Sequence, residues 1–362
     1  MMLSLLALLA LLALSPTSDQ PDPVRVAVVG LTHTHVHWIL GREDRGDIEI
    51  VGIWEPNEDL AGRYIEQHGL SPDLYYGDLD TMLDETEPEA VTVFTSIYEH
   101  LEVVEQVAPR GIHIMVEKPL AVSMDHALRM AELAKTHGVH LLTNYETTWY
   151  PSVHRTRAMV EAGELGPMRK MVIRDGHRGP KEIGVNEEFL EWLTDPVLNG
   201  GGAITDFGCY GANIATWLME GQRPQTVFAV TQTHKPDIYP HVDDEATIVL
   251  TYPGAQAIIQ ASWNWPVSRK DMAVYGRDAY VYADDGSRMR TRAGDDEPEH
   301  TFSADPADAP VDDPFAYLAL VVRGELDPAQ DLNSLPINLI VMEILDAARE
   351  SARTGSAIRL AD

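Results

Sequence analysis

Short apolar runs alternate with helical patterns over the first third of the chain. The runs are nearly continuous in Val, Ile, Leu and Ala, and they occupy residues 24–29, 48–54, 90–95, 112–116 and 139–143. Such runs are typical of strands that are buried on both faces of a sheet. Segments with helical periodicity lie between them, at residues 58–68, 79–84, 101–108 and 124–137. Because parallel strands need crossover connections, this alternation predicts an α/β domain with a doubly wound parallel sheet over residues 24–143.

The pattern changes after residue 143. Helical patterns at residues 152–162 and 213–219 are followed by clustered strand-like runs, at residues 225–233, 245–252, 256–263, 271–275 and 279–282. Clustered strands after an α/β unit predict a separate α+β domain with a largely antiparallel open sheet, here over residues 144–362. Residues 293–312 are acidic and rich in Pro and Ala, which predicts a surface loop. Two closing helices fall within residues 314–354, and whether they pack back on the first domain is left open.

The amino terminus differs from the rest of the chain. Residues 2–14 form an apolar run that is shorter than the ~20 residues needed to span a bilayer, and Ser15, Pro16, Thr17 and Ser18 follow it. This pattern predicts a signal peptide at residues 1–18 and an exported protein, periplasmic or secreted. The first basic residue is Arg25, so a wrongly assigned start codon and a cytoplasmic protein remain the alternative. No other stretch is long and apolar enough to predict a membrane span.

Composition excludes some functions. The chain has 57 acidic and 27 basic residues, a formal charge of -30, which repels phosphate backbones and argues against nucleic acid as a partner. Only six of the basic residues are Lys. An acidic, Lys-poor surface is typical of proteins that work in high salt, although a GC-rich genome gives the same bias. Cys209 is the single cysteine, so no intramolecular disulfide can form.

The turn after the first apolar run has part of a dinucleotide fingerprint. Residues 30–35 read G-L-T-H-T-H, where G-x-G-x-x-G would let the backbone approach a pyrophosphate at a helix N-terminus. Gly30 is present, while Thr32 and His35 replace the other two glycines. Glu55 directly follows the second run, 25 residues after Gly30, at a position where an acid can bind the ribose hydroxyls of NAD and repel the extra phosphate of NADP. We therefore predict a Rossmann-type site that binds NAD, with NADP less favoured.

Three histidines at spacing two, His33, His35 and His37, follow the same strand. Such a run could supply metal ligands, but side chains at i and i+2 diverge where a helix begins. We therefore predict no metal site, and we expect His33 and His35 to line the pyrophosphate or substrate cleft.

Several motifs together resemble one known family. Residues 116–126 read V-E-K-P-L-A-V-S-M-D-H, and residues 200–208 read G-G-G-A-I-T-D-F-G. The turn from Thr95 to His100, the V-D-D at residues 242–244 and the closing segment at residues 347–358 match in order. This combination resembles the glucose–fructose oxidoreductase/inositol dehydrogenase (Gfo/Idh/MocA) family. The resemblance implies an NAD(P)-dependent enzyme that acts on sugars, sugar alcohols or glycosides, and it implies a homo-oligomer.

The resemblance also implies roles for individual residues. Lys118 would lie near the nicotinamide and the reacting hydroxyl and would act together with Asp206 and Tyr210. Proton transfer by Lys118 would work best with a pKa lowered by burial. Tyr210 stands where the family commonly has His, and it would need a cationic neighbour such as Lys118 to act as a proton carrier.

The remaining predicted site residues fall into two groups. The predicted cofactor-binding residues are those of the turn (Gly30, Thr32, His33 and His35) together with Glu55, Thr95, His100, Glu117 and Asn144. The substrate group consists of Trp149, Tyr150 and Asn213.

The predicted function is hydride transfer between a sugar carbinol and nicotinamide. Two alternatives stay open at this point. One is a glycoside-cleaving enzyme that recycles tightly bound NAD, and the other is a non-catalytic sugar or nucleotide sensor. Release of NADH would separate the dehydrogenase from the recycling enzyme, and replacement of Lys118 would leave a sensor largely intact.

Overall fold

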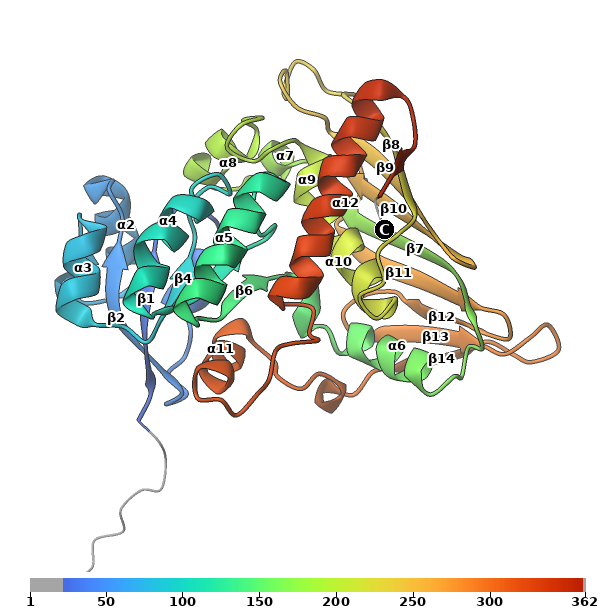
Figure 1. Ribbon diagram of the computed structural model, residues 1–362, viewed down its shortest axis with the longest axis horizontal. Helices are drawn as coiled ribbons and strands as arrows, with labels where there is room; N and C mark the ends of the chain where they lie inside the picture. The colour runs from blue at the N-terminus through green and yellow to red at the C-terminus, as the bar shows by residue number, and fades with distance from the viewer. Residues whose placement is uncertain (1–21, 361–362) are drawn as a thin grey trace, which may run out of the picture.

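The computed structural model describes residues 22–360, so the predicted signal segment 1–18 lies outside the described residues. Two sheets form the molecule (Figure 1). The first has six parallel strands in the order β3-β2-β1-β4-β5-β6, which are β1 Val24–Val29, β2 Ile48–Trp54, β3 Tyr75–Tyr76, β4 Ala90–Val93, β5 His113–Glu117 and β6 Leu141–Asn144. This order confirms the doubly wound parallel sheet. The strands β1 to β3 are added toward one edge of the sheet and β4 to β6 toward the other, so the strand order reverses between β1 and β4, which is the point where such sheets bind ligands.

Five helices cover the first sheet, and they are α1 Val36–Leu40, α2 Glu58–His68, α3 Leu79–Thr86, α4 His100–Val107 and α5 Met124–His137. Three of them begin at a side chain that accepts an amide hydrogen bond, namely Asn57, Asp78 and Ser123. These caps satisfy amides that have no partner within the helix. The first helix, α1, is only five residues long.

The second sheet has nine strands in the order β14-β13-β12-β11-β7-β10-β9-β8-β15. Their bounds are β7 Met168–Gly176, β8 Thr226–Gln232, β9 Glu245–Tyr252, β10 Ala255–Ser262, β11 Arg269–Gly276, β12 Tyr280–Ala283, β13 Arg288–Arg292, β14 His300–Ser303 and β15 Ile358–Arg359. Only the β7–β10 pair is parallel, so the predicted largely antiparallel sheet is confirmed. β14 corrects the predicted loop at residues 293–312, because this short edge strand is mostly exposed and has no apolar periodicity.

Seven helices and four short 3-10 helices complete the described chain. The helices are α6 Pro151–Glu161, α7 Pro180–Ile183, α8 Glu187–Leu193, α9 Ala203–Asp206, α10 Gly208–Leu218, α11 Pro314–Val322 and α12 Leu335–Thr354. The 3-10 helices are η1 Pro72–Leu74, η2 Ala108–Arg110, η3 Glu146–Trp149 and η4 Pro306–Asp308. α10 begins five residues before the predicted helix at 213–219, which places Tyr210 within it.

The two closing helices contact the first domain. α11 contributes Phe315 and Leu318 to the core that contains Val26 and Val28 of β1. α12 lies between the two sheets and contacts α5 and β6 on one side and α10 and β8 on the other (Figure 1).

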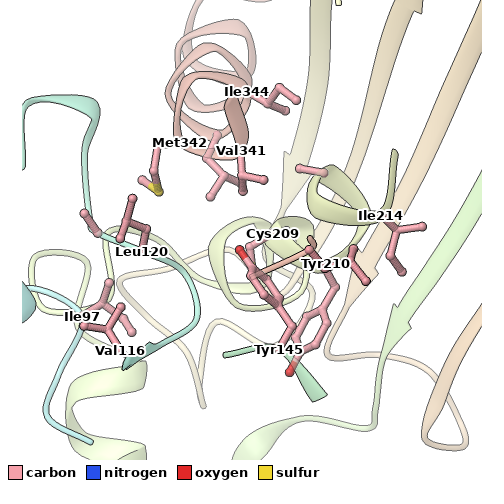
Figure 2. Close-up of a cluster of buried hydrophobic side chains, with 14 of the residues drawn as sticks. Ile97, Val116, Leu120, Tyr145, Cys209, Tyr210, Ile214, Val341, Met342 and Ile344 are labelled. Carbon is pink, nitrogen blue, oxygen red and sulfur yellow. The ribbon is translucent and has the colours of Figure 1, made fainter. Parts of the chain in front are cut away.

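The apolar core is continuous across the domain boundary. Figure 2 shows Ile97, Val116 and Leu120 of the first domain in one buried cluster with Cys209 and Tyr210 of α10 and Val341 of α12. Tight packing resists small displacements, so this shared core holds the ends of β5 and β6 in place relative to α9 and α10. Among the described residues, none of the helices has the length and apolar character needed to cross a membrane.

Candidate active site

A buried ion pair joins the two domains. Lys118 follows β5, and its Nζ lies 2.5 Å from Asp206 Oδ1 and 3.1 Å from the Asp206 carbonyl oxygen. The other carboxylate oxygen, Oδ2, accepts a hydrogen bond of 2.9 Å from the indole of Trp263. Burial favours a neutral Lys118, but the charge of Asp206 outweighs it and raises the pKa of the ammonium. The expectation of a lowered pKa for Lys118 is therefore wrong, because the carboxylate that positions the lysine also keeps it charged.

Tyr210 lies beside this pair and faces two cations. Its ring centroid is 5.1 Å from Lys118 Nζ and 4.7 Å from Lys270 Nζ. Burial, with the nearby Glu146 carboxylate as the next cause, raises the pKa of Tyr210 well above its usual value. The cations contact the ring face and do not make the phenol acidic, so Tyr210 is a neutral phenol at physiological pH.

A pocket of about 810 Å³ opens beside these residues. Its walls carry many charged side chains, and they include Glu146, Tyr150, His177, Phe207, Arg269, Lys270, Asp271, Asp285 and Arg288. Lys270 forms an ion pair with Glu146, which also accepts a hydrogen bond from the hydroxyl of Tyr150. Tyr150, one of the predicted substrate residues, therefore lies in the wall of this pocket.

Two residues from the end of β7 belong to this region and were missed by the sequence analysis. His177 lines the pocket, and its Nδ1 accepts the Gly179 amide at 3.0 Å, so the neutral ring carries its proton on Nε2. Burial lowers the pKa of His177 to about 4. Asp175 lies opposite Lys270 in the β7–β11 register, and neither carboxylate oxygen has a hydrogen-bond partner among the described residues. No motif marks these residues: His177 follows β7 at the pocket wall, and Asp175 lies beside the pocket through its pairing with Lys270.

Polar groups also gather at the carboxyl ends of β5 and β6. Glu117 Oε1 accepts a hydrogen bond of 2.8 Å from Asn144, whose own Oδ1 accepts one of 3.1 Å from the Trp149 indole. Glu117 Oε2 lies 3.0 Å from His35 Nδ1. Burial opposes ionisation of Glu117, but its electrostatic interactions with His35 and His33 and its hydrogen bonds with His35 and Asn144 outweigh burial and lower the pKa of Glu117 to about 2. Trp149 packs against Tyr317 of α11 and does not line the 810 Å³ pocket.

The turn after β1 is held by its own hydrogen bonds. Gly30 has φ +79°, and a Cβ at this position would lie 2.5 Å from Thr95 Cγ2, so glycine is required. The Leu31 amide donates to Glu55 Oε2 at 2.9 Å, and the Asn57 amide donates to Glu55 Oε1 at 3.0 Å. The predicted ribose ligand Glu55 thus fixes the turn, and Thr32 Oγ1 donates to the Phe94 carbonyl.

His33, His35 and Glu117 form a compact cluster. His33 Nε2 lies 3.8 Å from Glu117 Oε2, and the possible ligand atoms of the three residues lie within 4.8 Å of one another. The His35 amide donates to His33 Nδ1 at 3.1 Å, so the neutral His33 ring carries its proton on Nε2, where a metal would bind. His37 lies outside the cluster, with its Nδ1 2.8 Å from His68 Nε2.

Three predicted residues make other contacts. Thr95 Oγ1 donates to the Ser96 carbonyl, and the fully buried His100 donates from Nδ1 to the Leu120 carbonyl at 3.1 Å. Asn213 donates to the Leu332 carbonyl at 2.8 Å in the core next to α12. The structure does not bring His100 or Asn213 to the pocket.

The donor set fits the nicotinamide end of a dinucleotide. Glu117 and Asn144 offer a carboxylate and an amide at the strand ends, next to Lys118, and the turn after β1 lies where this fold binds a pyrophosphate. The pyrophosphate end is covered by protein in this structure. The rings of Phe189 and Trp192 from α8 lie 4.6 and 5.7 Å from the His33 ring.

Fold and site together define an oxidoreductase built on a dinucleotide-binding α/β domain. Residues 24–145 match the family model described as oxidoreductase family, NAD-binding Rossmann fold, and residues 153–282 match the GFO/IDH/MocA C-terminal domain. The chain therefore belongs to the GFO/IDH/MocA family, as the E-K-P motif and the glycine-rich segment suggested.

Curated relatives are distant. A D-xylose 1-dehydrogenase (NADP(+)) from Haloferax volcanii is 28% identical over 340 residues, which is 92% of this chain and 98% of that protein. A trans-1,2-dihydrobenzene-1,2-diol dehydrogenase from Bos taurus is 24% identical over 229 residues, 63% of this chain. The chain spans only 64% of the length of that second relative.

Solved structures share the fold. An aldose-aldose oxidoreductase from Caulobacter crescentus superposes with a TM-score of 0.78 at 23% identity and covers 93% of this chain and 100% of that one. An inositol dehydrogenase homolog from Azotobacter vinelandii, complexed with NAD+, gives a TM-score of 0.80 at 19% identity, with 94% and 98% coverage.

Proposed function

We propose that the protein is an NAD-dependent oxidoreductase that transfers a hydride between nicotinamide and a hydroxyl-bearing carbon of a sugar, sugar alcohol or glycoside. The observation that carries this proposal is the Lys118–Asp206 pair. It lies at the carboxyl end of β5, between the predicted cofactor groove and the charged 810 Å³ pocket.

Lys118 handles the proton of the substrate hydroxyl. Its ammonium donates to the substrate oxygen and stabilises negative charge that develops there. In the reducing direction Lys118 gives a proton to the alkoxide. In the oxidising direction Lys118 takes the hydroxyl proton while it passes one of its own to Asp206 Oδ1, to which it is already hydrogen-bonded. A bound nicotinamide supplies or accepts the hydride at the adjacent carbon.

The second carboxylate oxygen of Asp206 is also hydrogen-bonded, which fixes the orientation of the side chain. The Trp263 indole donates to Oδ2, so the carboxylate presents Oδ1 to Lys118. Tyr210 is a neutral phenol that follows Asp206 by one helical turn. It packs against Lys118 and Lys270 and restricts the movement of both ammonium groups. These contacts restrict the reacting groups to one arrangement, which is how positioning lowers a barrier.

The pocket favours a polyhydroxylated substrate. Charged side chains and the Tyr150 hydroxyl offer both donors and acceptors within about 810 Å³. A xylose dehydrogenase among the relatives and an aldose oxidoreductase among the structural neighbours support an aldose or related polyol as the substrate.

NAD is the proposed cofactor in preference to NADP. Glu55 places a carboxylate at the end of β2, where the adenosine ribose of a dinucleotide binds in this fold, and a carboxylate there repels a 2′-phosphate. The D-xylose 1-dehydrogenases from Haloferax volcanii and Haloarcula marismortui are named for NADP(+), so both nucleotides belong in the test.

The test combines binding and turnover. NAD(H) and NADP(H) are first measured in the denatured protein, together with its metal content. Titration with each nucleotide and assays with a panel of aldoses and polyols follow. Binding of NAD with sugar-dependent NADH formation supports the proposal. Failure of both nucleotides to bind would contradict it, and glycoside cleavage without net NADH would favour the recycling alternative.

We also propose that the protein is exported and that it forms a homo-oligomer. The apolar run at residues 2–14 supports export, and membership of the family supports assembly. Mass measurement of the mature chain and light scattering in solution test the two statements separately.

A further inference from the structure

A segment of the second domain covers the end of the first sheet where β1 and β4 diverge. The polar side chains there are almost fully buried, with exposed fractions of 2% for Glu55, 4% for Thr95 and 1% for Glu117. The cover includes α8, which lies beyond the carboxyl ends of the parallel strands (Figure 1). Phe189 and Trp192 of α8 contact His33, which is only 1% exposed.

Polar contacts latch α8 to the first domain. Glu188 accepts hydrogen bonds from the hydroxyl of Tyr64 and from Arg63, the latter at 3.0 Å. Asn186 donates to Tyr64 and lies 3.4 Å from His37 Nε2. All of these contacts lie at the surface of α1 and α2 and none involves the Lys118–Asp206 pair.

The ends of the covering segment are fixed to the second domain. Before it, Glu182 is bound by Lys235 at 2.7 Å and by Tyr239. After it, Asp243 accepts the amides of Gly202 at 3.0 Å and Ile204 at 2.7 Å. Residues 183–201 lie between these anchors.

Glycines with left-handed backbone lie just inside both anchors. Gly184 and Gly200 each have φ +75°, and Gly201 has φ +154°. Glycine tolerates large changes of φ and ψ, and hinges are usually a few residues at the ends of elements. Rotation at these glycines would leave the anchors in place but would break the hydrogen bonds that the Leu198 carbonyl accepts from the Tyr98 amide and the Gly200 carbonyl accepts from Arg349, both at 3.0 Å.

The covered surface is poorly matched to its cover. His33 Nε2, Thr34 Oγ1 and Trp192 Nε1 are buried without a hydrogen-bond partner among the described residues. A buried polar atom without a partner costs free energy. A ligand that carries oxygen atoms could satisfy such groups, whereas the aromatic rings of α8 cannot. This mismatch argues for a removable cover and against a permanent wall.

We propose that residues 183–201 form a lid over the dinucleotide groove, latched by Tyr64 and Glu188, and that the lid swings aside at Gly184 and Gly200–Gly201 when a nicotinamide dinucleotide enters. This inference rests on the proposed function. Only molecules with an open lid can bind the dinucleotide, so the apparent affinity is the affinity of the open form multiplied by the fraction of molecules that are open. Weakening the latch raises this fraction and therefore raises the apparent affinity.

The test compares neighbouring variants on the same helix. Glu188→Ala removes the latch, and the exposed Glu187→Ala is its matched control. We expect Glu188→Ala to bind NAD+ about three- to tenfold more tightly, with a higher association rate, and Glu187→Ala to match the wild type. Isothermal titration and stopped-flow fluorescence with NAD+ give the two quantities.

A second variant tests the same latch with a smaller change of structure, in case Glu188→Ala does not fold. Tyr64→Phe keeps the buried ring and removes only the hydroxyl that contacts Glu188 and Asn186, and Tyr75→Phe is its control on the same domain. Hydrogen exchange of residues 183–201 reports the lid directly, and we expect faster exchange in Tyr64→Phe and a change on adding NAD+.

The outcomes separate the two proposals. Equal NAD+ affinity and association rate in the wild type and both latch variants would overturn the lid and leave the proposed function standing. Absence of binding by the wild type and every variant, for NAD+ and NADP+ alike, would overturn both.

Discussion

Single residues set the protonation state of the site. Lys118 and Asp206 are each almost fully buried, and each is charged because the other is present. Removing one partner leaves an uncompensated buried charge, which is strongly unfavourable. The pair is therefore a catalytic unit whose members cannot be replaced independently.

We expect Lys118→Ala to lower kcat by about 10²–10⁴, since a positioned proton donor contributes an effect of that size. Lys118→Arg should restore the charge but not the activity, because a guanidinium does not release its proton. The measurement is steady-state kinetics, with exposed Lys135→Ala as the control. Full kcat in Lys118→Ala would contradict this role, whereas absence of turnover in the wild type with ligand binding unchanged in Lys118→Ala would support a sensor.

For Tyr210, in contrast to Lys118, we predict that removing the polar group has only a small effect on kcat. Its pKa is raised well above the usual value by burial, so the phenol does not ionise in the working range. Tyr210→Phe keeps the ring beside Lys118 and Lys270, and we expect less than about a tenfold loss in kcat with an unchanged pH profile. Loss of a limb of the kcat/KM profile in this variant would show that Tyr210 exchanges a proton.

Asp175 makes stability depend on pH. Burial raises its pKa to about 8 from a usual value near 4, so the folded protein keeps this proton over a range where the unfolded chain has lost it. The contribution of Asp175 to the free energy of unfolding is fully present at low pH. It is lost as the pH rises toward 8, by about 1.4 kcal/mol per pH unit. Urea unfolding at pH 5 and pH 8 should show that Asp175→Asn removes this loss. A variant with the wild-type pH dependence would contradict the assignment.

At the scale of elements, the turn after β1 and the helix α2 respond oppositely to the same substitution. Gly30 has φ +79° and no room for a Cβ beside Thr95, whereas Gly62 lies within α2 with nothing within 4 Å. We expect Gly30→Ala to destabilise the fold by about 1–3 kcal/mol and Gly62→Ala to stabilise it by about 0.5–1 kcal/mol. Thermal unfolding of both variants checks the signs, and a neutral Gly30→Ala would show that the turn can relax.

Elements with strong local signals could be predicted from the sequence. The strands of the first sheet are apolar runs, and α5 has a serine cap, a regular apolar face and a glycine at its end. β3 and β14 were missed because two and four residues without apolar alternation carry no periodic signal. α8 was missed because its burial comes from contacts with His33 and Tyr64, which are distant in sequence.

At the scale of the whole molecule, the site is a product of topology. The family resemblance predicted that Lys118 of the E-K-P motif acts together with Asp206 of the glycine-rich segment. In the structure the two side chains are hydrogen-bonded to each other. His177 and Lys270 line the pocket, and Asp175 pairs with Lys270 across β7 and β11. These residues could not be predicted, because their positions depend on the pairing of strands that are distant in sequence. Glu55 lies at the predicted strand end, but its carboxylate binds backbone amides, a detail that depends on the turn's conformation.

The net charge of -30 acts on the molecule as a whole. Like charges on a compact surface repel one another, and this repulsion is relieved when the chain unfolds. Salt reduces it, because the screening length falls from about 10 Å at 0.1 M to about 3 Å at 1 M. We therefore expect the Tm to rise by several degrees between 0.1 and 1 M KCl, with NaCl giving the same rise. A Tm that does not depend on either salt would contradict a destabilising charge repulsion, and a rise with sulfate but not chloride would point to ion exclusion from the surface.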